Sequence, residues 1–581
     1  MAAAPVKLRT DTAQVVIGVL LCGGSILLAD AAGNPYWTHN FQLLTVLATV
    51  AFFQNFLLCD AGQASFGQGA VFGASAYAGA ILCGMHGVAY WLAAIGGVGA
   101  AMLFGLMFAM PALRVQGYYL GFVTFGAALV FPDLIVALDD YTHGVNGIPL
   151  AFDAINTRGA LGISPLSVII VVVAGLSLAL LAWLRRTGFG RAMQVAAISP
   201  EAALSLGISP GRMRCGAFLI CAAGTGVAGA LYAPVVGFVG PSAFNVELSI
   251  LFFFAVIVGG RGQPLGPIAG IVVIYLLPNM LLAEVISFRL LLYGGIALVV
   301  MLALPDGLVG SFERWRRRRA MQPEPLDLRI EAVVRDGGEG GRARDGVVIA
   351  MQGGCKLFGR VAALDEVDIT VRSGEIHGLI GANGSGKTSL LNVLSGLSRL
   401  DRGTLRINGV ATQRLPAWRI ARLGIGRTFQ TPRVFEALST WENLVIGLDA
   451  AGAGRAAVQP EALRLLEHRL ADYPVGAVTH GQRRLLEVLR VVLKGADLLL
   501  LDEPAAGLSA RERGEFSALL LRLRDRFGKT IVLVEHDLDL VTSIADRLTV
   551  LDAGRVVASG TAAEVVRDPA VRSLFVGSVH A

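Results

Sequence analysis

The sequence predicts two parts of different character, an all-α polytopic membrane domain followed by an α/β domain built on a parallel sheet. Three observations support this division. Of the 581 residues, 54% are hydrophobic and only 16% are charged, whereas soluble proteins carry about 25% charged residues. The apolar excess ends near Leu304, and charged residues crowd the remainder. Within that remainder, the apolar run Ile376–Ile380 leads into the glycine-rich stretch Gly381–Thr388.

About ten apolar segments lie between Val15 and Leu304, each close to the roughly 20 residues that a helix needs to cross a bilayer. Their approximate centres are Leu20, Val50, Ala76, Gly97, Thr124, Val172, Gly226, Phe254, Val273 and Ala297. Glycine and alanine are frequent in these segments, which favours helices that pack closely against one another. We therefore expect about ten transmembrane helices in a domain formed by residues 1–312.

The basic residues predict how these helices are oriented. Lys7 and Arg9 precede the first apolar segment, which we interpret as an uncleaved membrane helix because many further segments follow. Cytoplasmic loops carry excess positive charge, and the loops expected inside contain Arg114, Arg185, Arg186, Arg191, Arg212, Arg214 and Arg261. The loop expected outside, around residues 139–143, carries none. We expect a multi-pass protein of the cell inner membrane, with both termini and the second domain in the cytoplasm.

Residues 313–346 form the predicted linker. Arg314 and residues 316–319 directly follow an apolar segment, where anionic lipid explains them better than nucleic acid does, despite a formal charge of +6. The later part mixes charges with glycine, which is typical of a flexible connection. The six cysteines show neither a CxxC pair nor a metal-binding spacing. Membrane lipid is therefore an expected partner, and nucleic acid is not.

The glycine-rich stretch fits the phosphate-binding pattern G-x-x-x-x-G-K-[ST]. Its residues are Gly381, Ala382, Asn383, Gly384, Ser385, Gly386, Lys387 and Thr388. Glycines let successive backbone N–H groups turn toward a phosphate chain, and a following helix adds its partially positive N-terminus. Lys387 would reach the β- and γ-phosphates, and the Thr388 hydroxyl would ligate Mg²⁺. The stretch predicts a nucleotide-binding loop, with a simple turn before a surface helix as the alternative.

Two carboxylates follow the apolar run Leu498–Leu501. Asp502 and Glu503 would stand at the carboxyl end of a buried parallel strand, where such sheets bind ligands. Oxygen ligands suit Mg²⁺, so Asp502 is its expected ligand and Glu503 the expected general base. His536 follows another apolar strand and could reach the γ-phosphate, and Gln430 could touch Mg²⁺ and the attacking water. Taken alone, a histidine in such a position is more often structural, and Gln430 would be unremarkable.

The order of these motifs resembles the nucleotide-binding domain of an ABC transporter. The resemblance implies that residues 347–581 form an ATPase with a small antiparallel β lobe and a helical signature subdomain. It also implies that Phe358 stacks on adenine, although the residues alone leave core packing equally open. Two such domains pair head to tail, so that each ATP lies between one P-loop and the partner's signature segment. The signature residues here are Thr479, His480, Gly481 and Gln482.

Longer segments are similar to the importer family for branched-chain amino acids. GIGRTFQTPRVFEALSTWENLVIG and LLDEPAAGLS resemble its ATPase subunit, and SPEAALSLGI, GALYAPVVGFVGP and VIVGGRGQPLGPIAG resemble its permease subunit. The chain thus resembles a natural fusion of the two. The resemblance implies ATP-driven uptake of a small solute, most often branched-chain or other amino acids. It implies as partners a second permease, a second ATPase subunit and an external solute-binding protein.

A short helix-forming run in the first half resembles the EAA loop of importer permeases. It contains Glu201, Ala202 and Ala203 and stops at Gly207. In that family this coupling helix docks into a groove of the ATPase and transmits its motion to the membrane helices. An ordinary amphipathic loop helix is the alternative on the residues alone.

The signature departs from the family pattern. Thr479 keeps a hydroxyl for the γ-phosphate, whereas His480 adds bulk where small or aromatic residues are usual, so one of the paired ATP sites could be slow. Three alternative functions stay open: import of urea, an amide or an aromatic acid by the same mechanism, an ABC exporter half, and a membrane-anchored regulatory ATPase. Short loops and many spans disfavour the exporter.

Overall fold

The computed structural model describes residues 6–113, 118–152, 162–278, 288–318, 346–451, 466–467, 470–471, 473 and 475–576. Contacts divide the chain into two compact units, one of residues 1–197 and 210–322 and the other of residues 198–209 and 323–581. Most of the predicted linker, residues 319–345, lies outside the described residues, as does Arg114 of the predicted orientation pattern.

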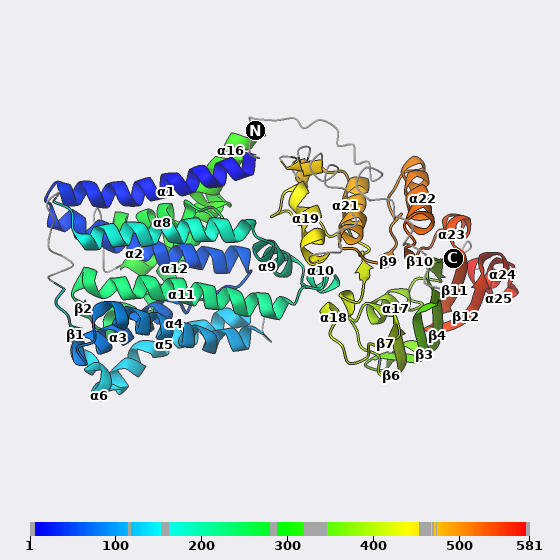
Figure 1. The fold of residues 1–581 in the computed structure, drawn as a ribbon, viewed down its shortest axis with the longest axis horizontal. Helices are drawn as coiled ribbons and strands as arrows, with labels where there is room; N and C mark the ends of the chain where they lie inside the picture. Colours follow the sequence, from blue (N-terminus) through cyan, green and yellow to red (C-terminus); the bar gives the residue numbers. More distant parts are fainter. Residues whose placement is uncertain are drawn as a thin grey trace. The chain divides into compact units, whose positions relative to one another are not determined.

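The first unit is built of helices (Figure 1). The long helices are α1 (Val6–Ala31), α2 (Pro35–Asn55), α4 (Tyr90–Ala112), α5 (Tyr118–Ala137), α8 (Pro165–Arg186), α11 (Pro210–Val236), α12 (Val246–Gly259) and α15 (Arg289–Ala303). Shorter helical elements are η1 (Phe56–Asp60), α3 (Gln68–Ala80), η2 (Ile81–Met85), α6 (Asp139–Thr142), η3 (Gly144–Asn146), α9 (Gly188–Ile198), η4 (Pro241–Phe244), α13 (Gly266–Ile271), η5 (Val272–Leu276) and α16 (Gly307–Arg318). The strands β1 (Ile148–Pro149) and β2 (Phe238–Val239) form a small antiparallel pair.

Within the described residues, 8 helices are long and apolar enough to cross a membrane. These helices contain all but two of the predicted span centres. The remaining centres, Ala76 and Val273, lie on the shorter elements α3 and η5. Each of these shorter apolar segments combines an α-helical part with a π-helical part, α3 with η2 and α13 with η5. The predicted segments are therefore all helical, although these two are shorter than we expected.

Helix α11 packs against α2, α3 and α4. Small residues make this approach possible. A Cβ atom on Gly105 would lie 2.3 Å from the Cβ of Ala222, and one on Gly229 would lie 2.5 Å from the carbonyl oxygen of Phe72. The abundance of glycine and alanine in the sequence thus corresponds to closely packed helices.

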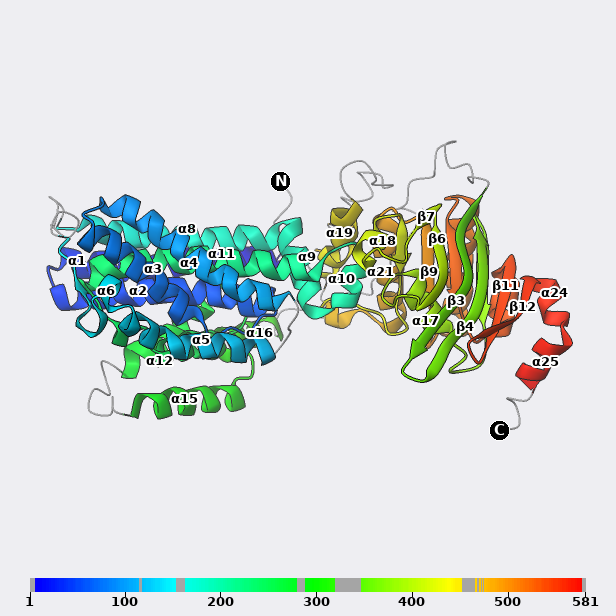
Figure 2. The ribbon, with the colours of Figure 1, turned by 90° about the horizontal axis from the view of Figure 1, so that it is seen from below.

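Helix α15 lies at the edge of the first unit (Figure 2). It packs against α12, and its leucines Leu291, Leu298 and Leu302 are exposed on the unit. A helix that satisfies its own backbone hydrogen bonds and presents leucine side chains is suited to contact with lipid tails.

The second unit contains the short helix α10 (Pro200–Ser205) and the elements that follow residue 346. The strands are β3 (Val347–Phe358), β4 (Val361–Arg372), β5 (Ile376–Ile380), β6 (Arg402–Ile407), β7 (Val410–Ala411), β8 (Ile425–Arg427), β9 (Leu498–Asp502), β10 (Thr530–Val534), β11 (Arg547–Asp552) and β12 (Arg555–Thr561). The helices are α17 (Lys387–Leu394), α18 (Ala417–Ala421), α19 (Thr440–Ala451), η8 (Val475–Ala477), α21 (His480–Leu493), α22 (Ala510–Asp525), α23 (Leu538–Ile544), α24 (Ala562–Arg567) and α25 (Pro569–Val576).

These strands form two sheets (Figure 2). The 6-stranded sheet has the order β12-β11-β5-β10-β9-β8 and is parallel except for the edge strand β12, and the 4-stranded sheet β4-β3-β6-β7 is antiparallel. Strands β5, β9 and β10 are buried along their whole length, as their apolar sequences require. The predicted α/β fold with a small antiparallel lobe is therefore present.

Candidate nucleotide-binding site

The glycine-rich loop connects β5 to α17, the strand and helix that the phosphate-binding pattern requires. Gly381 and Gly386 have φ angles of +154° and +106°, which side-chain-bearing residues rarely adopt. A Cβ atom on Gly381 would lie 2.1 Å from the carbonyl oxygen of Leu551, and one on Gly386 would lie 2.5 Å from that of Ala363. The loop therefore needs glycine at both positions for its conformation and for space.

Lys387 and Thr388 occupy the first turn of α17. The Nζ atom of Lys387 donates hydrogen bonds of 2.9 Å to the carbonyl oxygens of Gly381 and Ala382, so the side chain lies along the loop. Burial lowers the pKa of Lys387, and the nearby carboxylates of Glu503 and Asp502 oppose that shift. Thr388 is exposed, as are Ala382, Asn383 and Gly384, whereas Ser385 is buried. The surface of the loop is thus accessible to a ligand.

The parallel register brings the other predicted residues to the same edge of the sheet. Val534 pairs with both Asp502 and Leu379, and Arg427 pairs with Leu500. The segments that follow β5, β8, β9 and β10 therefore leave the sheet side by side. These segments carry the P-loop, Gln430, Glu503 and His536, respectively.

Asp502 is only 3% exposed. Its Oδ2 atom lies 3.8 Å from the Nη2 atom of Arg427, and its Oδ1 atom has no hydrogen-bond partner among the described residues. Burial raises the pKa of Asp502, and the guanidinium of Arg427 opposes the rise. An unpartnered buried carboxylate oxygen suits a hard cation such as Mg²⁺, which keeps most of its waters and needs few protein ligands. The described residues contain no group of three or more histidine, cysteine, aspartate or glutamate residues that could hold a metal ion.

Glu503 has a φ angle of +43°, which is strained for a residue with a side chain. Its backbone N–H donates to the carbonyl oxygen of Val534 at 2.9 Å, which holds this conformation. The Oε2 atom of Glu503 accepts a hydrogen bond of 2.9 Å from the Nε2 atom of Gln430. The structure thus brings together two residues that are 73 positions apart in the sequence.

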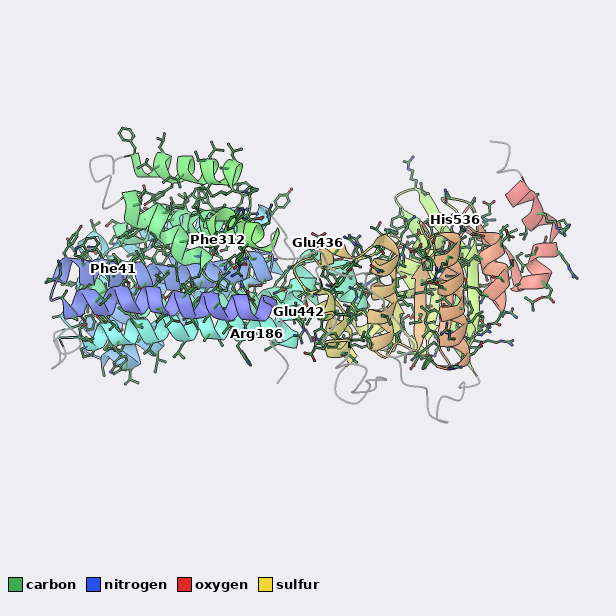
Figure 3. The ribbon with its side chains drawn as sticks, turned by 90° about the horizontal axis from the view of Figure 1, so that it is seen from above. Phe41, Arg186, Phe312, Glu436, Glu442 and His536 are labelled. Atoms are coloured by element: carbon green, nitrogen blue, oxygen red, sulfur yellow. The ribbon has the colours of Figure 1, made fainter. Side chains whose placement is uncertain are left out.

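His536 lies beyond the end of β10 with 63% of its side chain exposed (Figure 3). Its neighbour Glu535 is buried, and the Oε1 atom of Glu535 accepts a hydrogen bond of 2.8 Å from the backbone N–H of Ala505. The buried glutamate therefore fixes the strand end, and the histidine remains available to a ligand.

The predicted signature residues form the N-terminus of α21. Thr479 caps the helix through its side chain, and the Thr479 backbone N–H donates a hydrogen bond of 2.9 Å to the Oε1 atom of Gln482. This reciprocal arrangement is a capping box. His480 is the first residue of the helix, and a Cβ atom on Gly481 would lie 2.6 Å from the Oε1 atom of Glu512. The N–H groups and the positive end of this helix favour an anion.

Phe358 ends strand β3 and is 53% exposed. The Nζ atom of Lys356 lies 5.3 Å from the centre of its ring. The core-packing alternative is therefore wrong, because the ring lies on the surface of the second unit. An exposed ring is free to stack on a planar base, which is the role that the sequence comparison with ABC transporters implied.

Arg484 is a residue that the sequence reasoning missed. It is fully buried in α21 and donates hydrogen bonds to the backbone carbonyl of Phe429, to that of Gln430 at 2.6 Å and to that of Glu503 at 3.2 Å. One side chain of the signature helix thus fixes both loops of the candidate site. The detectable signal was the spacing of Arg484, Glu487 and Arg490, charges that share one face of a helix otherwise rich in leucine and valine.

Residues 198–209 belong to the second unit. Ala202 and Ala203 of α10 are buried there, and Glu201 lies 3.5 Å from Arg433. Gly207 has a φ angle of +79°, and its carbonyl oxygen accepts a hydrogen bond of 3.1 Å from the Nε atom of Arg422. This run therefore packs on the domain that carries the P-loop instead of lying free as an amphipathic loop helix.

Comparison with known proteins finds matches to both parts of the chain. Residues 40–304 match the family described as the branched-chain amino acid transport system permease component, and residues 364–506 match the family described as ABC transporter. The chain is 35% identical over 251 residues to the high-affinity branched-chain amino acid transport ATP-binding protein LivG of Salmonella typhimurium, covering 40% of this chain and 98% of LivG. It is 33% identical over 250 residues to BraF, the protein of the same description from Pseudomonas aeruginosa, again covering 40% and 98%.

Solved structures also match the second part. The crystal structure of a nucleotide-free ATP-binding cassette from an ABC transporter is 29% identical to it, with a TM-score of 0.35, and the match covers 40% of this chain and 99% of the cassette.

Proposed function

Because this chain belongs to the ABC transporter family, as a branched-chain amino-acid type permease fused to its ATPase, we propose that it imports branched-chain or other amino acids. It is a multi-pass membrane protein, and its ATPase domain hydrolyses ATP in a reaction coupled to transport. The solute is the part of this function that we propose. The observation that supports it is the joint presence, on one chain, of the permease match and of an ATPase that resembles LivG and BraF.

In the proposed mechanism, Lys387 and the loop from Gly381 to Thr388 hold the phosphates of ATP, and Phe358 stacks on its adenine. Thr388, Gln430 and Asp502 would hold Mg²⁺, which neutralises charge on the phosphates when bound. Glu503 takes a proton from the attacking water, and its hydrogen bond with Gln430 orients the carboxylate. His536 contacts the γ-phosphate from the next strand end.

The proposed assembly contains a second permease and a second ATPase domain, from a homologous subunit or another copy of this chain. The signature residues Thr479, His480, Gly481 and Gln482 would then act on the partner's ATP. The helix with Glu201, Ala202, Ala203 and Gly207 transmits closure of the ATPase domains to the membrane helices. We propose an inner-membrane location with the ATPase in the cytoplasm. Arg185 and Arg186 lie in the last turn of α8, and positive charge next to a membrane helix is typical of its cytoplasmic end. An external binding protein delivers the solute.

The test is solute uptake by native right-side-out membrane vesicles loaded with ATP and given periplasmic extract as the source of binding protein. Labelled leucine, urea, acetamide and benzoate are offered separately. We expect ATP-dependent accumulation of leucine by vesicles with the wild-type chain. The variant Glu503→Gln should bind ATP but accumulate nothing, whereas Glu436→Gln, which changes an exposed glutamate of the same unit, should behave as wild type (Figure 3).

Other results would identify an alternative function. Accumulation of urea, acetamide or benzoate without leucine would replace the amino acid by that solute class. ATP-dependent loss of preloaded solute would indicate an exporter. Hydrolysis of ATP with no movement of any solute would favour a regulatory ATPase.

A further inference from the structure

Lys494 follows the last residue of α21 and is almost completely buried. Its Nζ atom donates three hydrogen bonds to backbone carbonyl oxygens, to Ser205 at 2.8 Å, to Ala421 at 2.8 Å and to Ile425 at 2.6 Å. An ammonium group has three N–H bonds, so each of them has an acceptor here.

The acceptors of Lys494 come from three separate elements. Ser205 is the last residue of α10, Ala421 is the last residue of α18, and Ile425 begins β8. The C-terminal carbonyls of a helix lack partners within the helix and carry partial negative charge. One lysine therefore caps two short helices at once and ties both of them to a strand of the main sheet.

The three carbonyl oxygens are the groups that stabilise the ammonium form of Lys494. Burial lowers the pKa of Lys494 to about 7, and the neighbouring guanidinium of Arg422 shifts it in the same direction. Within the described residues, no carboxylate forms an ion pair with it. A contact that depends on three backbone groups is lost in part whenever one of the three elements moves away.

The same elements lead to the candidate ATP site. Strand β8 is followed by Gln430, which donates a hydrogen bond to Glu503, and α21 is capped at its N-terminus by the signature residue Thr479. The side chain of Lys494 is thus a direct connection between residues 198–209 and the segments that carry these groups.

We propose that Lys494 is a positioning residue that couples the 198–209 segment to the ATP site, by holding the C-terminal end of α10 against the start of β8. The inference rests on the proposed function, in which that segment transmits the motion of the ATPase. Lys494 is the side chain of the ATPase that transmits this motion to the 198–209 segment.

The test compares Lys494→Met with Lys529→Met. Lys529 is a second mostly buried lysine of the same unit, and its Nζ atom donates a hydrogen bond of 2.9 Å to the Oδ1 atom of Asp497. Among the described residues, its side chain makes no hydrogen bond or ion pair with the 198–209 segment. The first measurement is amide hydrogen exchange of residues 199–207 in the purified complex carrying Glu503→Gln, with and without ATP. The second is the number of solute molecules accumulated per ATP hydrolysed, without Glu503→Gln. Lys494→Gln is included because it keeps two N–H donors if the methionine variant folds poorly.

We expect Lys494→Met to abolish the ATP-dependent change in exchange at residues 199–207 and to lower the uptake per ATP on the order of tenfold, a typical strength of coupling between sites. Its KM for ATP should stay unchanged, and Lys529→Met should behave as wild type. A normal exchange response in both Lys494 variants would overturn the proposal, as would an equal loss of the response in Lys529→Met. If no solute is accumulated by the wild type but the exchange response depends on Lys494, the proposed function fails and this inference stands.

Discussion

The Nε2 atom of Gln430 donates a hydrogen bond of 2.9 Å to the Oε2 atom of Glu503. The two residues follow β8 and β9, parallel strands that are neighbours in the sheet. The bond leaves the other carboxylate oxygen of Glu503 for a water molecule. Gln430 therefore fixes the direction in which the proposed base points.

We expect Gln430→Ala to lower the kcat of ATP hydrolysis on the order of 100-fold, the usual contribution of a well-oriented general base. The affinity for ATP should change little, because the P-loop residues are untouched. Steady-state hydrolysis and binding of a fluorescent ATP analogue measure the two quantities. Gln352→Ala, an exposed position on β3, serves as the control and should leave kcat unchanged. A Gln430→Ala enzyme with full kcat would show that Glu503 is oriented by something else.

Gly386 and Gly384 of the P-loop allow a matched comparison. Both have positive φ angles, +106° and +82°, but a Cβ atom on Gly386 would lie 2.5 Å from the carbonyl oxygen of Ala363, whereas one on Gly384 would meet nothing within 4 Å. Gly386→Ala should abolish ATP binding because the loop must move to relieve the clash. Gly384→Ala should lower the free energy of unfolding only by the cost of a positive φ angle at alanine, about 1–2 kcal/mol. Thermal midpoints and nucleotide titrations of both variants check this order, and equal effects would contradict it.

The capping box of the signature helix predicts a third result. Thr479→Ala removes the side chain that accepts from the Gln482 backbone N–H, so α21 should lose about 1 kcal/mol of stability, whereas Thr479→Ser keeps the hydroxyl and should lose little. The thermal midpoint of the ATPase transition should fall by about 2–4 °C for the alanine variant alone. Equal midpoints for both variants would show that the cap contributes no stability.

Much of the candidate site could be predicted from the sequence because its residues directly follow apolar runs that are recognisable as buried strands. Asp502, Glu503 and His536 each follow an uninterrupted apolar run, and parallel strands bring their carboxyl ends to one edge. The position of each residue directly after its strand is then enough to predict that the residues lie close together. The same holds for the P-loop, whose pattern requires the strand and helix that flank it.

Arg484 and Lys494 could not be predicted in this way. Arg484 lies on α21 and Lys494 directly follows it, where basic residues usually face water. Their partners are distant backbone carbonyls, up to 289 positions away for Lys494 and Ser205. Every residue has a backbone carbonyl, so the sequence does not indicate which carbonyl accepts a hydrogen bond from a distant side chain. The lengths of α3 and η5 were also missed, because hydropathy does not record where a helix changes to π-helical geometry.

Asp60, which is buried, and Arg185, whose side chain is 16% exposed, form an ion pair in the first unit. The Oδ2 atom of Asp60 lies 2.8 Å from both the Nε and Nη2 atoms of Arg185, and its Oδ1 atom accepts a hydrogen bond of 2.9 Å from the Nε2 atom of Gln194. Arg185 also donates to the carbonyl oxygen of Gly262 at 2.7 Å. The pair thus joins the end of η1 to the end of α8, and Gln194 adds a bond from α9.

Removing one partner of this pair leaves the other charge buried and should cost about 3–5 kcal/mol. Asp60→Leu and Arg185→Met should each lower the thermal midpoint of the first unit strongly. The double variant Asp60→Leu with Arg185→Met buries no charge, so its midpoint should lie above that of either single variant. Gln194→Ala, which keeps the pair and removes one neutral donor, should cost only about 1 kcal/mol. Additive effects in the double variant would mean that the two side chains do not interact energetically, and the short distances between them would then have no part in stability.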